Sequence, residues 1–420
     1  MAQAPLMRIL LLTQLFQPEP NHLKGLHFAK ELARRGHQVE VLTGYPNYPG
    51  GSVYRGYRIR PWMRETMDGI TVTRVMMNPS HNRSAIGRIT CYASFALSAA
   101  NLGPYLMKKP DIIHVYQGPS TLGWPAIVFR AILGVPYVLD VQDLWPESVS
   151  SSRMLPIPGV ASVLGLWSKL TYRFARKIVV LSEGYRDRLI SRGVPSSKIE
   201  VVYNWCDEQF VQKNGESVGF APFDLRGRFN VVYTGNFGVV QALKTVLDAA
   251  SIVENVRPDI QFVLVGDGVE RLALKEIAAR RNQKNVLFVP RQSQERLQFI
   301  TAAADILIVH LKDDPLTRVS IPQKTQYALA AGKPVIMAVR GNAADLVREA
   351  GAGIVCRPES AEDLSHAVLN LASLPSDELR SIGNRGREFY KQKLSFCIGL
   401  EKTLSVLESA AHPHHVRTAH

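Results

Sequence analysis

Short, continuous apolar runs alternate with longer segments of mixed polarity along most of the chain. Runs of this length, without polar alternation, are typical of parallel strands that are buried on both faces. Helical patterns over residues 23–35 and 122–133 lie between some of them. The first half therefore predicts a parallel sheet covered by helices. Its predicted strands are Met7–Thr13, Gln38–Thr43, Ile70–Val75, Asp111–Tyr116, Pro136–Val141, Lys177–Ser182 and Ile199–Val202.

The same alternation starts again after residue 228 and predicts a second α/β domain. Its strands are expected at Phe229–Thr234, Ile260–Gly266, Val286–Val289, Ile306–Val309 and Val335–Ala338. The intervening segment is polar and contains glycine, which favours a linker. We predict domains over residues 1–207 and 229–395, with a linker over 208–228. An amphipathic helix over 396–410 and a disordered tail over 411–420 complete the prediction.

Composition adds a charge asymmetry to this picture. The chain has 420 residues, 46% of them hydrophobic, and a net charge of +14. Residues 1–210 hold 24 Lys/Arg against 14 Asp/Glu, an excess of +10, and the remainder holds 26 against 22, an excess of +4. A basic first half indicates an anionic partner: nucleic acid, an acidic lipid surface or a phosphorylated substrate.

Two further features bear on where the protein works. Its four cysteines have no metal-ligand or Cys-x-x-Cys spacing, so we expect them to be reduced, as in the cytoplasm. The first residues lack the charged-then-apolar pattern of a signal peptide. No apolar run reaches the ~18–20 residues that a membrane-spanning helix needs.

The most distinctive segment covers residues 321–337. Pro322 suits the first position of a helix, and Gly332 suits the left-handed residue that ends one. The predicted helix carries Lys324 in its first turn. A helix N-terminus with a lysine is a place to hold phosphate.

Several turns of the second domain follow directly after predicted strands. Ligands of parallel sheets gather at this carboxyl edge, so we expect the turns to meet a phosphate-bearing ligand. Ordinary tight turns and solvated surface arginines are the structural alternatives. The candidate residues of these turns are Gly235, Asn236, Gly266, Asp267, Gly268, Pro290 and Arg291, and Arg318 flanks the start of the Lys324 helix.

Two loops of the first domain are dense in polar and aromatic groups. One follows the strand ending at Val141 and offers Asp143 as the leading catalytic carboxylate, with Asp140 and Glu147 as competitors and a helix cap as the structural alternative. The other covers residues 44–51. His114 lies inside an apolar strand, so we interpret it as a core histidine.

Together, these motifs resemble the family 4 glycosyltransferases, over about residues 7–405 and in the same order. The branch they resemble builds bacterial O-antigen, capsule and colanic-acid repeats. The resemblance implies a GT-B fold: α/β, with two Rossmann-like parallel-sheet domains facing a central cleft and a last helix that returns to the first domain. It implies a donor site at Gly235, Asn236, Gly266, Asp267, Gly268, Pro290, Arg291, Arg318, Lys324 and Tyr327. It implies an acceptor site at Tyr45, Asn47, Tyr48, Asp143 and Glu147.

The same resemblance implies an activity. We expect a retaining glycosyltransferase that moves a hexose-type sugar from a nucleotide diphosphate, UDP, to a hydroxyl of a lipid-linked saccharide acceptor. Asp143 and Lys324 are the expected catalytic residues, and the leaving phosphate helps to deprotonate the acceptor. The family needs no metal and no other cofactor. Expected partners are the nucleotide sugar, the acceptor and an anionic membrane surface, and no nucleic acid.

The chain departs from the family pattern at two places. Many relatives carry two glutamates, eight positions apart, where this chain has Val319 and Tyr327. Many also carry a basic pair where this chain has Asn236 and Gln241. Two alternatives stay open. One is a sugar-nucleotide epimerase on the same fold, which would need convergent carboxylates and histidines that the sequence does not indicate. The other is a non-catalytic scaffold that binds a nucleotide sugar, which the missing carboxylates favour.

Two apolar segments with basic flanks predict a peripheral location on the inner face of the cytoplasmic membrane. One covers residues 83–109 and is expected to break at Gly103 and Pro104. The other is a helical stripe over 160–177, beside Lys169, Arg173 and Arg176. The structural alternative is that both belong to the core. The apolar members of the stripe are Val160, Val163, Leu164, Trp167, Leu170 and Phe174.

Overall fold

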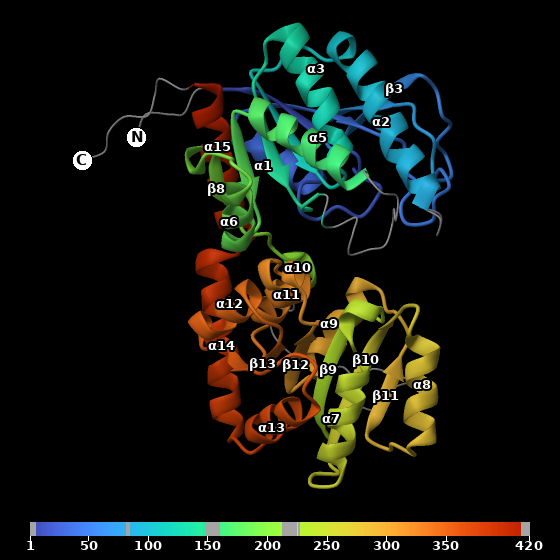
Figure 1. The fold of residues 1–420 in the computed structure, drawn as a ribbon, viewed down its shortest axis with the longest axis vertical. Helices are drawn as coiled ribbons and strands as arrows, with labels where there is room; N and C mark the ends of the chain where they lie inside the picture. The colour runs from blue at the N-terminus through green and yellow to red at the C-terminus, as the bar shows by residue number, and fades with distance from the viewer. Residues whose placement is uncertain are drawn as a thin grey trace, which may run out of the picture. The chain divides into compact units, whose positions relative to one another are not determined.

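The computed structural model of the chain describes residues 6–80, 85–145, 147, 160–211, 225 and 227–412. The chain divides into two compact units. The first comprises Met1–Val202 with Leu400–His420, and the second comprises Tyr203–Gly399. Each unit is built around one sheet with helices packed on it (Figure 1). Most of the predicted linker and of the predicted tail lies outside the described residues.

The sheet of the first unit has eight strands in the order β3-β4-β2-β1-β5-β6-β7-β8. All neighbours are parallel except β3, which pairs antiparallel with β4 at the edge. The seven predicted runs each form a strand, whereas β3 was not predicted because its residues alternate between exposed and half-buried. The strands are β1 Arg8–Thr13, β2 Gln38–Thr43, β3 Trp62–Met67, β4 Ile70–Val75, β5 Ile112–Gln117, β6 Tyr137–Val141, β7 Lys177–Val180 and β8 Ile199–Val201.

The sheet of the second unit is wholly parallel, in the order β11-β10-β9-β12-β13-β14. This order is that of a Rossmann-like sheet, whose first three strands run outward to one edge. All five predicted runs are strands, and the three-residue β14 adds a sixth at the other edge. The strands are β9 Phe229–Asn236, β10 Ile260–Asp267, β11 Val286–Val289, β12 Ile306–His310, β13 Val335–Ala338 and β14 Gly353–Val355.

Three helices of the first unit, α2, α3 and α5, pack side by side on its sheet (Figure 1). The prediction that Gly103 and Pro104 break α2 is wrong, because the helix continues through both to Leu106. Proline removes only one hydrogen bond here, and the helix ends within the next turn. The helices are α1 Leu26–Arg34, α2 Ala85–Leu106, α3 Gly123–Leu133, α5 Val160–Phe174, α6 Glu183–Ser191 and α15 Phe396–Ala411.

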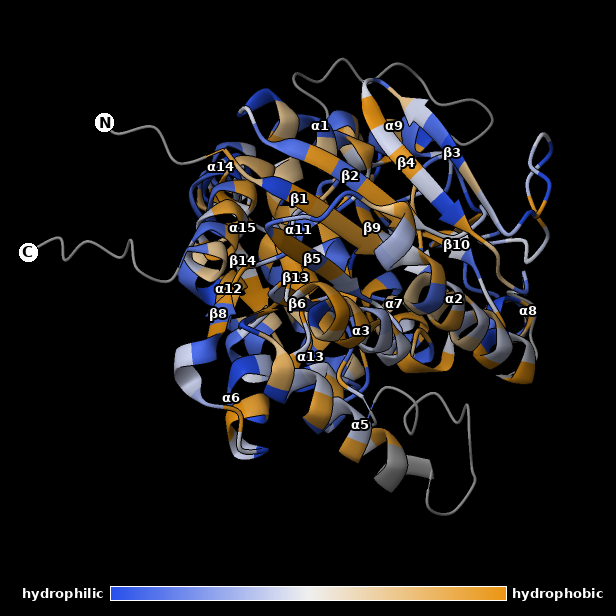
Figure 2. Ribbon diagram, turned by 90° about the horizontal axis from the view of Figure 1, so that it is seen from above, coloured by the Kyte–Doolittle hydropathy of each residue, from blue (hydrophilic) through white to orange (hydrophobic). Residues whose placement is uncertain are grey.

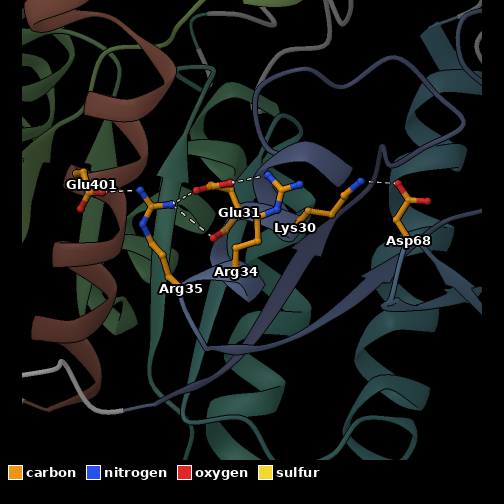
Figure 3. Close-up of polar contacts among 6 residues, drawn as sticks. All are labelled: Lys30, Glu31, Arg34, Arg35, Asp68 and Glu401. Atoms are coloured by element: carbon orange, nitrogen blue, oxygen red, sulfur yellow. Dashed lines mark hydrogen bonds and ion pairs between the residues drawn. The ribbon is translucent and has the colours of Figure 1, made fainter.

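Polar contacts attach the last helix, α15, to α1. Arg35 bonds Glu401 of α15 at 2.5 Å and Glu31 of α1 at 2.6 Å (Figure 3). Lys30, also on α1, pairs with Asp68 in the turn between β3 and β4, at 2.6 Å. The chain from Leu400 onward thus belongs to the first unit.

The helices of the second unit form two packed groups: α7 lies against α13, and α11 lies against α14. The core between α7, α13 and the sheet contains buried apolar residues such as Val231, Phe262 and Leu364. The helices are α7 Lys244–Glu254, α8 Arg271–Arg280, α9 Gln294–Ala302, α10 Pro315–Val319, α11 Gln323–Ala331, α12 Asn342–Ala350, α13 Ala361–Ala372 and α14 Ser376–Lys393.

Hydropathy follows burial in both sheets. The strands are drawn mostly in the hydrophobic colour, and the exposed sides of the helices are mixed (Figure 2). Among the described residues, no helix combines the length and the apolar character needed to cross a membrane.

Candidate functional site

Lys324 lies in the first turn of α11, at the carboxyl edge of the second sheet. The helix begins at Gln323, one residue after the predicted start, and Pro322 caps it in an extended conformation. It ends at Gly332 with φ 67°, as predicted. The Lys324 Nζ donates to the Tyr233 hydroxyl at 2.9 Å and lies 4.2 Å from the centroid of the Tyr233 ring.

The ammonium of Lys324 has no counter-charge in the part of the chain that the structure describes: no carboxylate forms an ion pair with it. Burial lowers the pKa of Lys324 from 10.5 to about 7. The protein removes the water that stabilises the charged form and supplies only a neutral hydroxyl and an aromatic ring in its place. An anionic ligand would provide the missing charge.

Two glycine turns stand next to this lysine. Gly235 has φ 144°, and a Cβ on it would lie 3.4 Å from Lys324 Nζ. The carbonyl oxygen of Gly235 is only 1.8 Å from where a Cβ on Gly266 would lie, so the two turns touch through their backbones. Only glycine fits such an approach at a positive φ. The structure therefore brings Lys324, Gly235 and Gly266 together, as the sequence predicted.

The backbone N–H groups of these turns are bonded within the protein. Phe237 N–H donates to the Asp267 carbonyl at 2.8 Å, and Gly238 N–H donates to the Gln241 side chain at 3.1 Å. Gly268 N–H donates to the Asp267 carboxylate at 2.8 Å. A phosphate that binds the Gly238 N–H has to displace the Gln241 side chain, which the sequence did not indicate.

Arg318 is engaged by a carboxylate rather than free. Asp313 accepts from its Nε at 2.7 Å and from its Nη2 at 3.0 Å, and Arg340 lies 3.3 Å from the same carboxylate. The hydrogen bond from Arg318 holds the pKa of Asp313 below its usual range. The neighbouring Asp314 caps α10 through the Leu316 N–H at 2.8 Å. The two aspartates thus hold an arginine pair and a helix start.

Three further donor candidates lie around the same sheet. Pro290 and Arg291 are exposed directly after β11, the neighbour of β10. Tyr327 is half-buried, and its hydroxyl lies 3.4 Å from both the Phe210 carbonyl and the Thr301 hydroxyl. Burial raises the pKa of Tyr327. Its hydroxyl therefore faces protein groups, and a ribose contact stays a prediction.

Asp143 follows β6 in the first unit, at the carboxyl edge of its sheet. The residue is exposed at the surface. The protein around its carboxyl nevertheless removes enough water to raise the pKa of Asp143 to about 6. A carboxyl that titrates near neutrality is suited to acid–base work, so Asp143 stays the leading catalytic candidate of this unit.

The two competitors of Asp143 are occupied by basic partners. Buried Asp140 lies 3.3 Å from His114 Nε2 and 3.6 Å from Lys24 Nζ. Burial acts to raise the pKa of Asp140, but the charge of Lys24 overcomes it and the pKa is lowered. Glu147 pairs closely with Arg192. Both carboxylates brace the fold here, and His114 is buried, as expected for a core histidine.

The loop over residues 44–51 is held from within. Tyr45 and Asn47 are buried, and the backbone N–H groups of Asn47 and Tyr48 each donate to Glu19 at 2.7 Å. The Tyr45 hydroxyl bonds the backbone of Arg60. In this structure Tyr45 and Asn47 present no surface to an acceptor, whereas Tyr48 is half-exposed.

Four residues that shape these sites were not found from the sequence. The Tyr233 hydroxyl accepts a hydrogen bond from Lys324, and the Glu19 carboxylate holds the loop over residues 44–51. Arg340 pairs with Asp313, as Arg318 does. Lys24 neutralises Asp140. Each partner is remote in sequence, so no local pattern marks the pair. A tyrosine inside a strand and a glutamate between two prolines have no sequence signature of a functional role.

Two family models match the chain, and together they span most of it. The Glycosyl transferase 4-like domain matches residues 26–205, and Glycosyl transferases group 1 matches residues 224–389. The first match falls on the unit with Asp143, and the second on the unit with Lys324.

Curated relatives agree with these matches. The chain is 27% identical to the putative colanic acid biosynthesis glycosyl transferase WcaI of Escherichia coli, over 82% of this chain and 86% of that one. It is 25% identical to the probable glycosyltransferase WbjE of Pseudomonas aeruginosa, over 70% and 74%. It is 24% identical to a GDP-mannose-dependent alpha-mannosyltransferase of Mycobacterium tuberculosis, over 83% of each.

Solved structures share the fold. HepE of Anabaena, in complex with UDP and glucose, matches with a TM-score of 0.64 at 16% identity, over 96% of this chain and 100% of that one. Trehalose 6-phosphate synthase of Burkholderia multivorans matches with a TM-score of 0.71 at 12% identity, over 97% and 98%.

Proposed function

We propose that this chain, which belongs to the family 4 glycosyltransferases with the GT-B fold, moves a hexose-type sugar from UDP to a hydroxyl of a lipid-linked saccharide, with retention at the anomeric carbon. The observation that carries the donor half of the proposal is the Lys324 ammonium, which lies beside the Gly235 turn with no carboxylate paired to it in the described residues. The resemblance to WcaI and WbjE favours an acceptor of surface-polysaccharide synthesis.

In the donor half, the diphosphate lies against the Gly235 and Gly266 turns and the N-terminus of α11. Lys324 and the helix terminus attract its negative charge. The uracil extends along the sheet edge toward Pro290 and Arg291, where an arginine can stack on a base. Arg318 and Arg340 border the site from the side of α12, with Asp313 between them.

In the chemical step, the acceptor oxygen bonds to the anomeric carbon on the face from which the diphosphate leaves. The bond between that carbon and the phosphate oxygen breaks, and the acceptor proton passes to the departing phosphate. Charge on the diphosphate grows during this step, so a cation already in place stabilises the transition state more than the bound donor. We propose that Lys324 supplies this charge and that the reaction needs no metal ion.

In the acceptor half, Asp143 orients the attacking hydroxyl as a hydrogen-bond acceptor, and half-exposed Tyr48 borders the sugar. The Glu19 carboxylate, through its two backbone bonds, keeps the Tyr48 loop in place. Because the pKa of Asp143 is about 6, its carboxylate is ionised at neutral pH and can accept a hydrogen bond from the acceptor hydroxyl.

A membrane-facing surface would give the enzyme access to a lipid-linked acceptor. The packed helices α2, α3 and α5, with the residues that directly follow α2 and α5, expose several large apolar side chains and several cations. A basic, apolar face of this kind binds anionic bilayers peripherally. Its exposed apolar members are Ile86, Leu97, Tyr105, Trp124, Ile132, Leu166, Leu170 and Phe174. Its exposed cations are Lys108, Lys109, Arg130, Lys169, Arg173 and Arg176.

One experiment tests this function against its alternatives. The protein is incubated with UDP-hexoses, and with GDP-mannose as the competing donor, both alone and with a lipid-linked saccharide fraction. Release of UDP with an axial anomeric product from an axial donor supports retaining transfer, and inversion would contradict it. Release of GDP alone would show that the donor nucleotide is GDP rather than UDP. Epimerised donor would favour the epimerase, and binding without any turnover would favour the scaffold.

A further inference from the structure

We propose that Tyr233 is a positioning residue, whose hydroxyl and ring hold the Lys324 ammonium against the Gly235 turn, at the place where the donor diphosphate binds. This inference rests on the proposed function and names a residue that the family motifs do not mark. Tyr233 lies on β9, and Lys324 lies on α11.

The geometry shows a complete seat for one ammonium. The fully buried Tyr233 donates its hydroxyl proton to the Asn236 carbonyl at 2.8 Å and accepts from Lys324 Nζ at 2.9 Å. The ring lies under the same nitrogen, 4.2 Å from it. A Cβ at Gly235 would lie 3.4 Å from both the Tyr233 hydroxyl and Lys324 Nζ. The tyrosine thus joins the turn to the lysine.

A neutral seat suits a phosphate-binding lysine better than an acidic one. The lysine side chain is long and flexible, and its ordering costs rotamer entropy. A carboxylate would fix the ammonium but would also neutralise it and repel the diphosphate. The Tyr233 hydroxyl and ring fix its place and leave its charge for the ligand. Lys324 also acts on His310 of β12: burial lowers the pKa of His310, and the charge of Lys324 lowers it further.

A purely structural role for Tyr233 is the competing explanation. Its bond to the Asn236 carbonyl and its ring contact with Phe237, 6.1 Å between centroids, also brace the turn after β9. If Tyr233 acted only on the turn, its loss would impair UDP binding whether or not Lys324 is present. If it acts through Lys324, the effect needs the lysine.

A double-mutant cycle separates the two roles. UDP affinity is measured by calorimetry for the wild type, Tyr233→Phe, Lys324→Met and the double variant. We expect Tyr233→Phe to weaken UDP binding about ten-fold in the wild type, as for one lost hydrogen bond to a charged group. In the Lys324→Met background we expect a change of less than about two-fold. Tyr137→Phe is the matched control, because the hydroxyl of this buried strand tyrosine donates to the Thr171 carbonyl, at 2.7 Å, and to no other group that the structure describes.

Equal losses in both backgrounds would overturn the inference and leave the proposed function intact, whereas a wild type that binds no nucleotide would overturn the function itself. A second variant covers the case in which Tyr233→Phe does not fold. Lys324→Arg keeps the charge, but its planar head does not fit the seat, so UDP affinity should recover little beyond that of Lys324→Met. Full recovery with arginine would show that the seat does not matter.

Discussion

Raising the pH from 7 to 9 should weaken UDP binding, because the Lys324 ammonium loses its proton in this range. Its pKa in the free protein is about 7, lowered from 10.5 by burial. About half of the molecules carry the charge at pH 7, and about one in a hundred at pH 9. If UDP binds the charged form, its affinity falls about fifty-fold, which is ~2.3 kcal/mol. The last phosphate proton of a nucleotide leaves near pH ~6, so the ligand stays fully charged in this window.

Calorimetric titration with UDP at pH 7, 8 and 9, at constant ionic strength, measures this slope. Buffers with different ionisation enthalpies should also reveal proton uptake on binding at pH 8. Lys324→Met is the control: we expect weaker binding that does not change over the same range. A flat wild-type profile, or an equal slope in Lys324→Met, would refute the assignment of the diphosphate to this lysine.

Lys324→Met should raise the melting temperature at pH 7. The pKa of Lys324 is lower in the folded protein than in the unfolded chain, where it is about 10.5, so at pH 7 the unfolded state binds the proton more tightly and the lysine destabilises the fold. Asp143→Asn should lower turnover at least about ten-fold with UDP affinity unchanged, and equal turnover in the variant would remove Asp143 from the site. Wild-type turnover should rise as the pH passes 6, where the Asp143 carboxyl ionises. Tyr327→Glu should lower the melting temperature, since a carboxylate would face the Phe210 carbonyl; tighter UDP binding at unchanged stability would instead place Tyr327 at the ribose. Sedimentation with anionic vesicles should weaken as salt rises and with Leu166→Glu; no binding at low salt would contradict the membrane surface.

Buried parallel strands were the most predictable part of the fold. Their continuous apolar runs need no knowledge of the partner strand, and every predicted run became a strand. Strand β3 was missed, because an edge strand that alternates exposed and half-buried positions resembles a loop in sequence. The break predicted at Pro104 is wrong because a proline near the end of a helix removes only one backbone hydrogen bond.

Candidate residues were predictable where backbone geometry determines them. Gly235, Gly266 and Lys324 meet because strand ends and a helix start converge on one sheet edge. Tertiary pairs were not predictable. The loop with Tyr45 and Asn47 looked like a binding surface, but Glu19 draws it inward. Likewise, nothing near Lys324 in sequence indicates Tyr233, which lies 91 residues away.

We propose that a nucleoside diphosphate binds at Lys324, beside the Gly235 and Gly266 turns. A crystal structure of the protein with UDP tests it most directly. We predict diphosphate oxygens within hydrogen-bond distance of Lys324 Nζ and the uracil near Arg291. UDP bound elsewhere, with the Lys324 ammonium still on Tyr233 and no phosphate contact, would rule out this donor site.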